Sequence, residues 1–209
     1  MKTDISVILD RSGSMQSVVT DTIGGFNQFL SDQKAQPGDA VFSLVQFDHD
    51  YEVIHASQPI ADVPPLTSQT FVPRGSTALL DAIGRTINST GARLAGIATA
   101  DRPQKVICVI VTDGYENASK EFTRTQINDM ITHQREAYSW EFVFLGANQD
   151  AIAEAAKIGI PLFAAMTNTL SAAGIGSTYR SVSNYVSNTR SGMTNVAFSD
   201  DDRKNAVQK

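Results

Sequence analysis

Short apolar runs alternate with stretches of helical spacing along this chain, and that alternation limits the folds open to it. The segment from Asp4 to Asp10 is interpreted as a first strand that ends in a carboxylate, and the apolar run from Val106 to Val111 as a strand buried on both faces. Apolar residues recur at helical spacing from Val18 to Leu30 and from Leu79 to Ile87. Strands that alternate with helices of this length predict an α/β protein with a mostly parallel sheet and helices on both faces.

One pair of strands is predicted to be antiparallel. The apolar segments Ala40–Phe47 and Tyr51–Ile54 are separated only by Asp48, His49 and Asp50. A parallel crossover needs a dozen or more residues, so this short connection indicates a hairpin. We therefore expect one antiparallel strand at an edge of the sheet.

The rest of the chain continues the alternation and then changes in character. Further helices are expected at residues 123–137 and 150–157, and further strands at Trp140–Leu145 and Gly159–Ala164. After Met166 the sequence becomes rich in Ser, Asn, Thr and Gly, but helical spacing returns around residues 179–186, and Ser199 is placed to cap a short final helix. We predict one domain over residues 1–166 and a C-terminal helical extension over residues 167–209.

Composition excludes several classes of function. The net charge of −5 argues against a nucleic-acid partner, which requires a basic surface. No apolar run approaches the roughly 20 residues of a membrane-spanning helix, so no membrane insertion is expected. Because the first strand begins at Asp4, no secretory signal is expected, and the cytoplasm is the expected location. The single cysteine, Cys108, lies within a buried strand and is interpreted as a core residue.

Three oxygen-rich fragments fall where such sheets bind ligands, outside the carboxyl ends of the strands. Asp10, Ser12 and Ser14 follow the first strand, Thr77 ends a long loop, and Asp113 follows the Val106–Val111 strand. Each fragment alone could form a turn or a helix cap instead of part of a metal site. Together they offer five oxygen donors without nitrogen or sulfur, the donor set of a hard cation. We predict a Mg²⁺ site, with Mn²⁺ or Ca²⁺ as the alternatives.

The pattern Asp10-x-Ser12-x-Ser14 with Thr77 and Asp113 resembles the metal-ion-dependent adhesion site (MIDAS) of von Willebrand factor A-like domains. This resemblance implies a Rossmann-like, doubly wound sheet with the metal at its top. It implies that Ser12, Ser14 and Thr77 bind the metal directly, and that Asp10 and Asp113 act mostly through water. It also implies a protein partner that presents a Glu or Asp to the metal. The chain is similar to stand-alone bacterial or phage members of the family.

Two other functions compete with a binding module. Family members also act as subunits of larger machines, so self-assembly or a structural role is an alternative. The second rival is a metal-dependent phosphotransferase of the haloacid dehalogenase class, in which an aspartate such as Asp10 ends a strand. That chemistry needs another carboxylate two residues further on, and Ser12 occupies the position. We therefore expect no enzymatic activity.

Two other groups of polar residues are interpreted as turns or connections rather than as ligands. His49 with its flanking acids, Asp48 and Asp50, is interpreted as a hairpin turn rather than a second metal site. Glu116 and Asn117 either line the metal site or begin the next connection, and the second interpretation is favoured.

Overall fold

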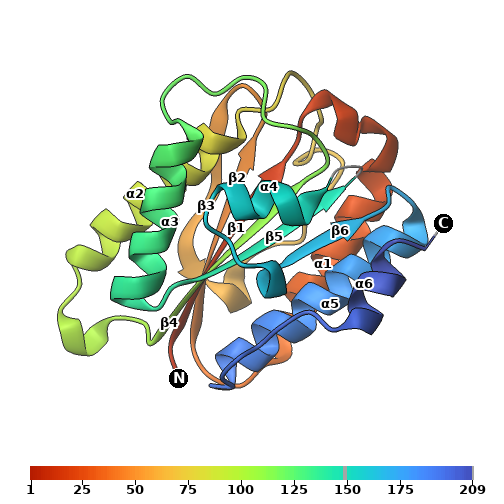
Figure 1. The fold of residues 1–209 in the computed structure, drawn as a ribbon. Coiled ribbons are helices and arrows are strands. Elements are labelled where there is room, and N and C mark those ends of the chain that lie inside the picture. The colour runs from red at the N-terminus through yellow and green to blue at the C-terminus, as the bar shows by residue number, and fades with distance from the viewer. Residues whose placement is uncertain (148–149, 209) are drawn as a thin grey trace.

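The computed structural model describes residues 1–147 and 150–208, and its centre is a six-stranded sheet (Figure 1). The strands are β1 (Thr3–Asp10), β2 (Ala40–Phe47), β3 (Tyr51–Pro59), β4 (Lys105–Thr112), β5 (Glu141–Ala147) and β6 (Ala165–Asn168). Their spatial order is β3-β2-β1-β4-β5-β6, and every neighbouring pair is parallel except β2 with β3. This confirms the predicted Rossmann-like α/β fold with one antiparallel edge strand.

Helices cover both faces of the sheet. They are α1 (Val19–Ala35), α2 (Leu79–Ala95), α3 (Arg124–Tyr138), α4 (Ala151–Lys157), α5 (Ala172–Arg190) and α6 (Asp200–Ala206). Figure 1 shows α1, α5 and α6 on one side of the sheet and α2 and α3 on the other. Among the described residues, no helix is both long and apolar enough to cross a membrane.

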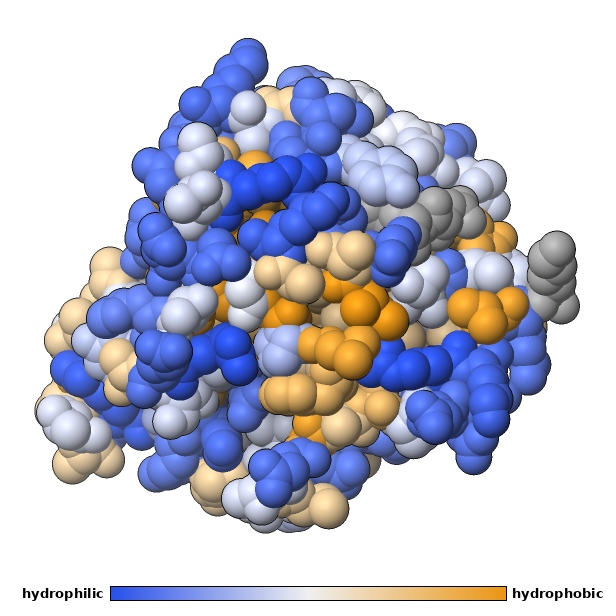
Figure 2. All heavy atoms as spheres, in the orientation of Figure 1, coloured by the Kyte–Doolittle hydropathy of each residue, from blue (hydrophilic) through white to orange (hydrophobic). Residues whose placement is uncertain are grey.

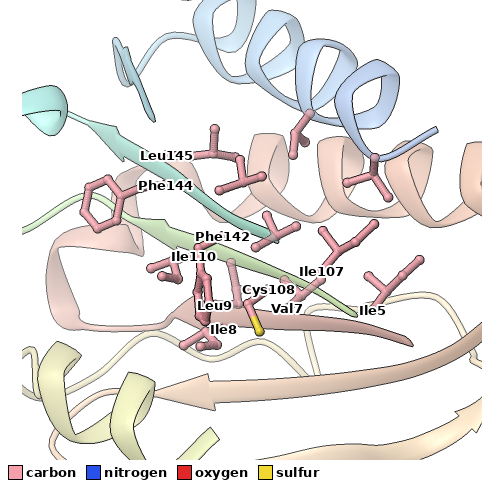
Figure 3. Close-up of a cluster of buried hydrophobic side chains, with 14 of the residues drawn as sticks. Ile5, Val7, Ile8, Leu9, Ile107, Cys108, Ile110, Phe142, Phe144 and Leu145 are labelled. Atoms are coloured by element: carbon pink, nitrogen blue, oxygen red, sulfur yellow. The ribbon is translucent and has the colours of Figure 1, made fainter. Parts of the chain in front are cut away.

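The core follows the central strands. Every residue of β1 is buried, including the polar side chains of Thr3, Asp4, Ser6 and Asp10. Figure 3 shows side chains of β1, β4 and β5 filling the space between the helical layers, among them Ile8, Ile110 and Phe144. Cys108 belongs to this cluster and is fully buried, in agreement with its interpretation as a core residue.

Capping residues set the starts of two helices, α3 and α6. Thr123 caps α3 through a reciprocal pair of hydrogen bonds with Gln126, and Ser199 caps α6 in the same way with Asp202. These caps satisfy backbone N–H groups that have no partner within the helix. The predicted starts of both helices are therefore correct to within a residue.

The predicted last strand, Gly159–Ala164, is wrong. Gly159 has a φ of +82° in the turn after α4, and Leu162–Ala164 forms a 3-10 turn that follows Pro161. The strand comes later, at Ala165–Asn168, where it pairs in parallel with Phe144–Ala147 of β5. A glycine and a proline in one short apolar segment favour turns over a strand, and here that local preference prevails.

Figure 2 shows an apolar area on one face of the molecule, near the 3-10 turn before β6. In this turn Leu162 is 60% exposed and Phe163 is 44% exposed. The turn lies at the amino end of β6, so the apolar area is at the opposite end of the sheet from the carboxyl ends of β1 and β4.

Helix α5 packs along α1 through a seam that is partly polar. The ring of Tyr179 lies so close to Gly25 that an added Cβ would approach it to 2.2 Å. Gln33 donates hydrogen bonds to the Ser183 carbonyl and to the Ser187 hydroxyl, each at 3.0 Å. Arg190 in turn donates to the Gln33 carbonyl oxygen. Although α5 covers α1 in this way, the domain boundary expected after Met166 stays a prediction.

Candidate metal centre

Three loops meet at the carboxyl end of the sheet, and backbone hydrogen bonds join the loop before α2 to each of the other two. The loop after β1 meets the loop before α2 through Gly13 N–H to Gly75 O (3.1 Å) and Arg74 N–H to Arg11 O (2.8 Å). Gly75 has a φ of +67°, and a Cβ there would lie 2.2 Å from Nδ1 of His49. Glycine suits this position, because the left-handed backbone conformation strains other residues and any side chain would also displace the ring of His49.

Asp10 ends β1 and is fully buried. Its Oδ1 accepts a hydrogen bond from the backbone N–H of Ser12, and its Oδ2 accepts one from the Thr112 hydroxyl, both at 2.6 Å. Both carboxylate oxygens are therefore engaged. This arrangement fixes the turn that carries Ser12 and Ser14 and ties it to the end of β4.

The remaining predicted residues lie beside this turn. The hydroxyls of Ser12 and Ser14 are 3.1 Å apart, and Ser14 donates to Oδ1 of Asp113 at 2.6 Å. A Cβ built on Gly114 would lie 3.4 Å from the Thr77 hydroxyl and 3.7 Å from that of Ser14. The structure thus brings all five predicted residues together, although they come from three separate segments of the chain.

The electrostatics of the cluster suit a cation. Burial raises the pKa of Asp10 to about 6, although hydrogen bonds from Thr112 and Ser12 oppose the increase. Burial also raises the pKa of Asp113. Within the described residues neither carboxylate has an ion pair, and Oδ2 of Asp113 is buried without a hydrogen-bond partner. Two buried carboxylates and three hydroxyls without a basic neighbour fit a hard divalent ion.

A second acidic cluster lies close by and is built differently. Asp48, His49 and Asp50 present potential ligand atoms within 4.8 Å of one another. However, Oδ2 of Asp48 already accepts hydrogen bonds from Nε of Arg11 (3.1 Å) and Nε of Arg74 (2.8 Å). Burial alone would raise the pKa of Asp48, but hydrogen bonds from Arg74 and from the Asp50 N–H and the charges of Arg11 and Arg74 lower it. Two arginines from neighbouring loops thus neutralise Asp48, consistent with the interpretation of this segment as a hairpin turn.

Glu116 and Asn117 have a larger role than the favoured interpretation gave them. Oε2 of Glu116 accepts the Leu80 N–H at 2.9 Å and so caps the first turn of α2. Oδ1 of Asn117 accepts the Thr77 N–H, also at 2.9 Å. No sequence signal pairs Asn117 with Thr77, because a polar residue after a strand is equally typical of any turn.

The sequence matches no protein-family model and no curated protein. Solved structures nevertheless share the fold. Proximal thread matrix protein 1 from the mussel byssus, solved with a zinc-occupied MIDAS motif, has a TM-score of 0.59 and 17% identity over 88% of this chain. A von Willebrand factor type A protein from Catenulispora acidiphila has a TM-score of 0.57 and 14% identity over 88%. The ArnB paralog VWA2 from Sulfolobus acidocaldarius has a TM-score of 0.54 and 13% identity over 84%.

This chain matches only 46%, 42% and 43% of the lengths of those three structures, in the order given. At such low identity the likeness establishes the fold alone. The chain has the fold of von Willebrand factor A domains, as the resemblance of its sequence implied.

Proposed function

We propose that this chain is a metal-dependent protein-binding module. In this proposal Asp10, Ser12, Ser14, Thr77 and Asp113 hold one divalent cation, with Mg²⁺ as the first candidate. The observation that carries the proposal is the buried Oδ2 of Asp113, which has no hydrogen-bond partner among residues 1–147 and 150–208 and lies in a cluster of oxygen donors to which those residues add no basic side chain. A buried carboxylate oxygen left without a partner is costly, and a cation relieves that cost.

The proposed metal site is buried on one side and open to solvent on the other. Asp10 is fully buried and Thr77 is 3% exposed, whereas Gly13 and Ser14 are exposed. When bound, a cation held largely by neutral hydroxyls keeps much of its positive charge and attracts an anionic oxygen. The accessible side at Ser14 gives a Glu or Asp of a partner protein a route to that charge.

The mussel byssus structure supports this proposal, because a protein of the same fold carries a divalent metal, zinc, at a site that bears the name MIDAS. The choice of Mg²⁺ here rests on the donor set instead. Hydroxyl and carboxylate oxygens suit Mg²⁺ better than they suit zinc, which favours nitrogen and sulfur ligands.

The state of Asp10 supports binding over catalysis. A phosphotransferase that uses this aspartate as its nucleophile needs a carboxylate oxygen that can reach substrate. In this structure both oxygens of Asp10 accept hydrogen bonds, and the side chain has no exposed surface. Asp10 is arranged to hold a turn in place, so the proposal includes no reaction. We also propose a protein partner in the cytoplasm rather than nucleic acid or a membrane.

The test is capture of partners from native lysate by the wild-type chain, by Thr77→Ala and by Ser76→Ala, each in Mg²⁺ and in a chelator. Ser76 is the matched control, since it is exposed and lies next to Thr77 outside the proposed ligand set. A partner that binds through the metal should be captured in Mg²⁺ by the wild type and by Ser76→Ala. It should not be captured in chelator or by Thr77→Ala.

Two further measurements sharpen the test. Substitution of one acidic residue of the partner should weaken binding as much as Thr77→Ala, and the two changes together should cost little more, because both break one bridge. Size-exclusion chromatography with and without Mg²⁺ separates this mechanism from self-assembly. A partner whose affinity ignores both chelator and Thr77→Ala does not bind through this mechanism.

A further inference from the structure

We propose that Asn117 is a positioning residue of the metal site, which holds the backbone of Thr77 so that its hydroxyl stays in the ligand set. This inference rests on the proposed function. Asn117 lies outside the five-residue pattern and is not one of the proposed ligands. It follows β4 on the same loop as Asp113.

The contacts between Asn117 and Thr77 hold both sides of one residue. The Thr77 N–H donates to Oδ1 of Asn117 at 2.9 Å. The Thr77 carbonyl accepts from the backbone N–H groups of Asn117 (3.0 Å) and Ala118 (3.2 Å). With its N–H and its C=O both fixed, Thr77 has its Cα–Cβ direction set. A β-branched side chain has few χ1 choices, so the hydroxyl position follows from the backbone.

The loop that carries Asn117 is itself anchored by other residues. Oε1 of Glu116 accepts the N–H groups of Ala118 (2.9 Å) and Ser119 (2.7 Å). The carboxylate of Asp81, on α2, accepts three further backbone N–H groups of the loop, those of Lys120, Glu121 and Phe122. Loss of the Asn117 side chain should therefore leave the loop in place and remove only its hold on Thr77.

The arrangement joins two proposed ligands that are far apart in sequence. Asp113 and Asn117 share one loop, whereas Thr77 precedes α2. Within the described residues no hydrogen bond holds the Thr77 hydroxyl itself, so its placement depends on the backbone. Asn117 thereby sets the distance between the Thr77 hydroxyl and the carboxylate of Asp113.

The test is a double-mutant cycle read by titration calorimetry with Mn²⁺ and with Mg²⁺. The four proteins are wild type, Asn117→Ala, Thr77→Ala and the double variant. Loss of one hydrogen bond at an exposed asparagine should weaken metal binding by about threefold to tenfold in the wild-type background. In the Thr77→Ala background Asn117→Ala should have no further effect, because the group that it positions is gone.

Two further variants separate positioning from general damage. Ser119→Ala is the matched control, because Ser119 lies on the same loop as Asn117. Its hydroxyl donates to Glu116 and accepts the N–H of Asp81 on α2, and no hydrogen bond among the described residues joins it to Thr77. Ser119→Ala should leave the metal affinity unchanged. Asn117→Asp keeps an oxygen that accepts the Thr77 N–H, so its effect should be equal in the two Thr77 backgrounds even if the added charge shifts both. If Asn117→Ala fails to fold, Asn117→Leu takes its place in the cycle, because it keeps a similar side-chain volume but offers no acceptor to the Thr77 N–H.

The outcomes are distinguishable. If the wild type binds metal and Thr77→Ala weakens it, but Asn117→Ala has no effect or an equal effect in both backgrounds, the positioning role is wrong and the proposed function stands. If the wild type does not bind metal, or Thr77→Ala binds as tightly, both fail together.

Discussion

Two acidic clusters lie at the same end of the sheet, and each contains a buried aspartate, but the surroundings of the buried carboxylates differ. Asp48 is fully buried and accepts hydrogen bonds from two arginines, Arg11 and Arg74. Asp10 and Asp113 are also buried, yet within the described residues no basic side chain pairs with either. The first cluster contains its own positive charge, whereas the second has none. Each cluster has two aspartates, so the number of acidic residues does not distinguish the clusters, whereas the presence or absence of basic partners does.

The largest effect that this comparison predicts is at Asp48. Asp48→Ala leaves Arg11, whose side chain is 8% exposed, without its buried partner. Removal of one partner of a buried ion pair costs about 3 to 5 kcal/mol of unfolding free energy. Because Glu52 still contacts Arg11 at 2.6 Å, we expect about 3 kcal/mol. Urea denaturation should show the same loss in Mg²⁺ and in chelator. A larger loss in Mg²⁺ than in chelator would place the metal at this cluster instead.

The second prediction concerns the cluster without basic partners. Mg²⁺ at a hundredfold excess over Kd should stabilise the wild type by about 2.7 kcal/mol. For a chain of this size, that gain corresponds to a rise in Tm of about 5–10 °C. A chelator should reverse the rise, and Asp10→Ala should abolish it. Equal responses of the two proteins in a thermal melt would show that the site is misassigned. In chelator, circular dichroism should keep its native helix and strand signal, because the core does not depend on the ion.

The third prediction uses the opposite pKa shifts of the two clusters. In chelator, the folded protein holds a proton on Asp10 more tightly than the unfolded chain does, because its pKa is raised from 3.8 to about 6. The unfolding free energy of the wild type should therefore rise, relative to Asp10→Asn, as the pH falls from 7 through 6 toward 4. The lowered pKa of Asp48 acts in the other direction, since its stabilisation is lost only below 3.8. Denaturant titrations of both proteins across this range test the difference, and parallel pH profiles would contradict it.

The smallest effect is expected at Arg74. Its side chain is 54% exposed, and Arg11 remains to pair with Asp48 when it is removed. Arg74→Ala should therefore have little effect on the unfolding free energy, as is typical of exposed ion pairs. Arg11→Ala should cost clearly more, because that side chain is buried. Equal losses in urea denaturation would mean that burial does not govern this cluster.

The sequence carried the outline of the proposed site, since strand ends in a parallel sheet meet at one edge and Asp10 and Asp113 each follow an apolar run. It did not carry the contacts that distinguish the clusters. Arg11 meets Asp48 and Asn117 meets Thr77 only after the chain has folded, across 37 and 40 positions respectively. Such pairs have no fixed spacing in the sequence, so no sequence pattern predicts them.

The misplaced final strand has a different cause. The segment Gly159–Ala164 is apolar enough for a strand, but it also contains a glycine and a proline, and the strand forms just after them. A strand of four residues at a sheet edge gives little periodic signal. Its position is set by pairing with Phe144–Ala147, a tertiary contact that a sequence window does not contain.

The seam between α1 and α5 has a consequence for the order in which the protein forms during synthesis. The hydrogen bond from Gln33 to the Ser183 carbonyl spans 150 positions. As α1 leaves the ribosome, the helix that completes its packing has not yet been made. At about 5 to 20 residues per second, synthesis of the intervening residues takes roughly 8 to 30 seconds, during which part of the apolar surface of α1 stays uncovered. We expect a nascent chain stalled before α5 to engage chaperones or proteases, and release of the stall to end that exposure.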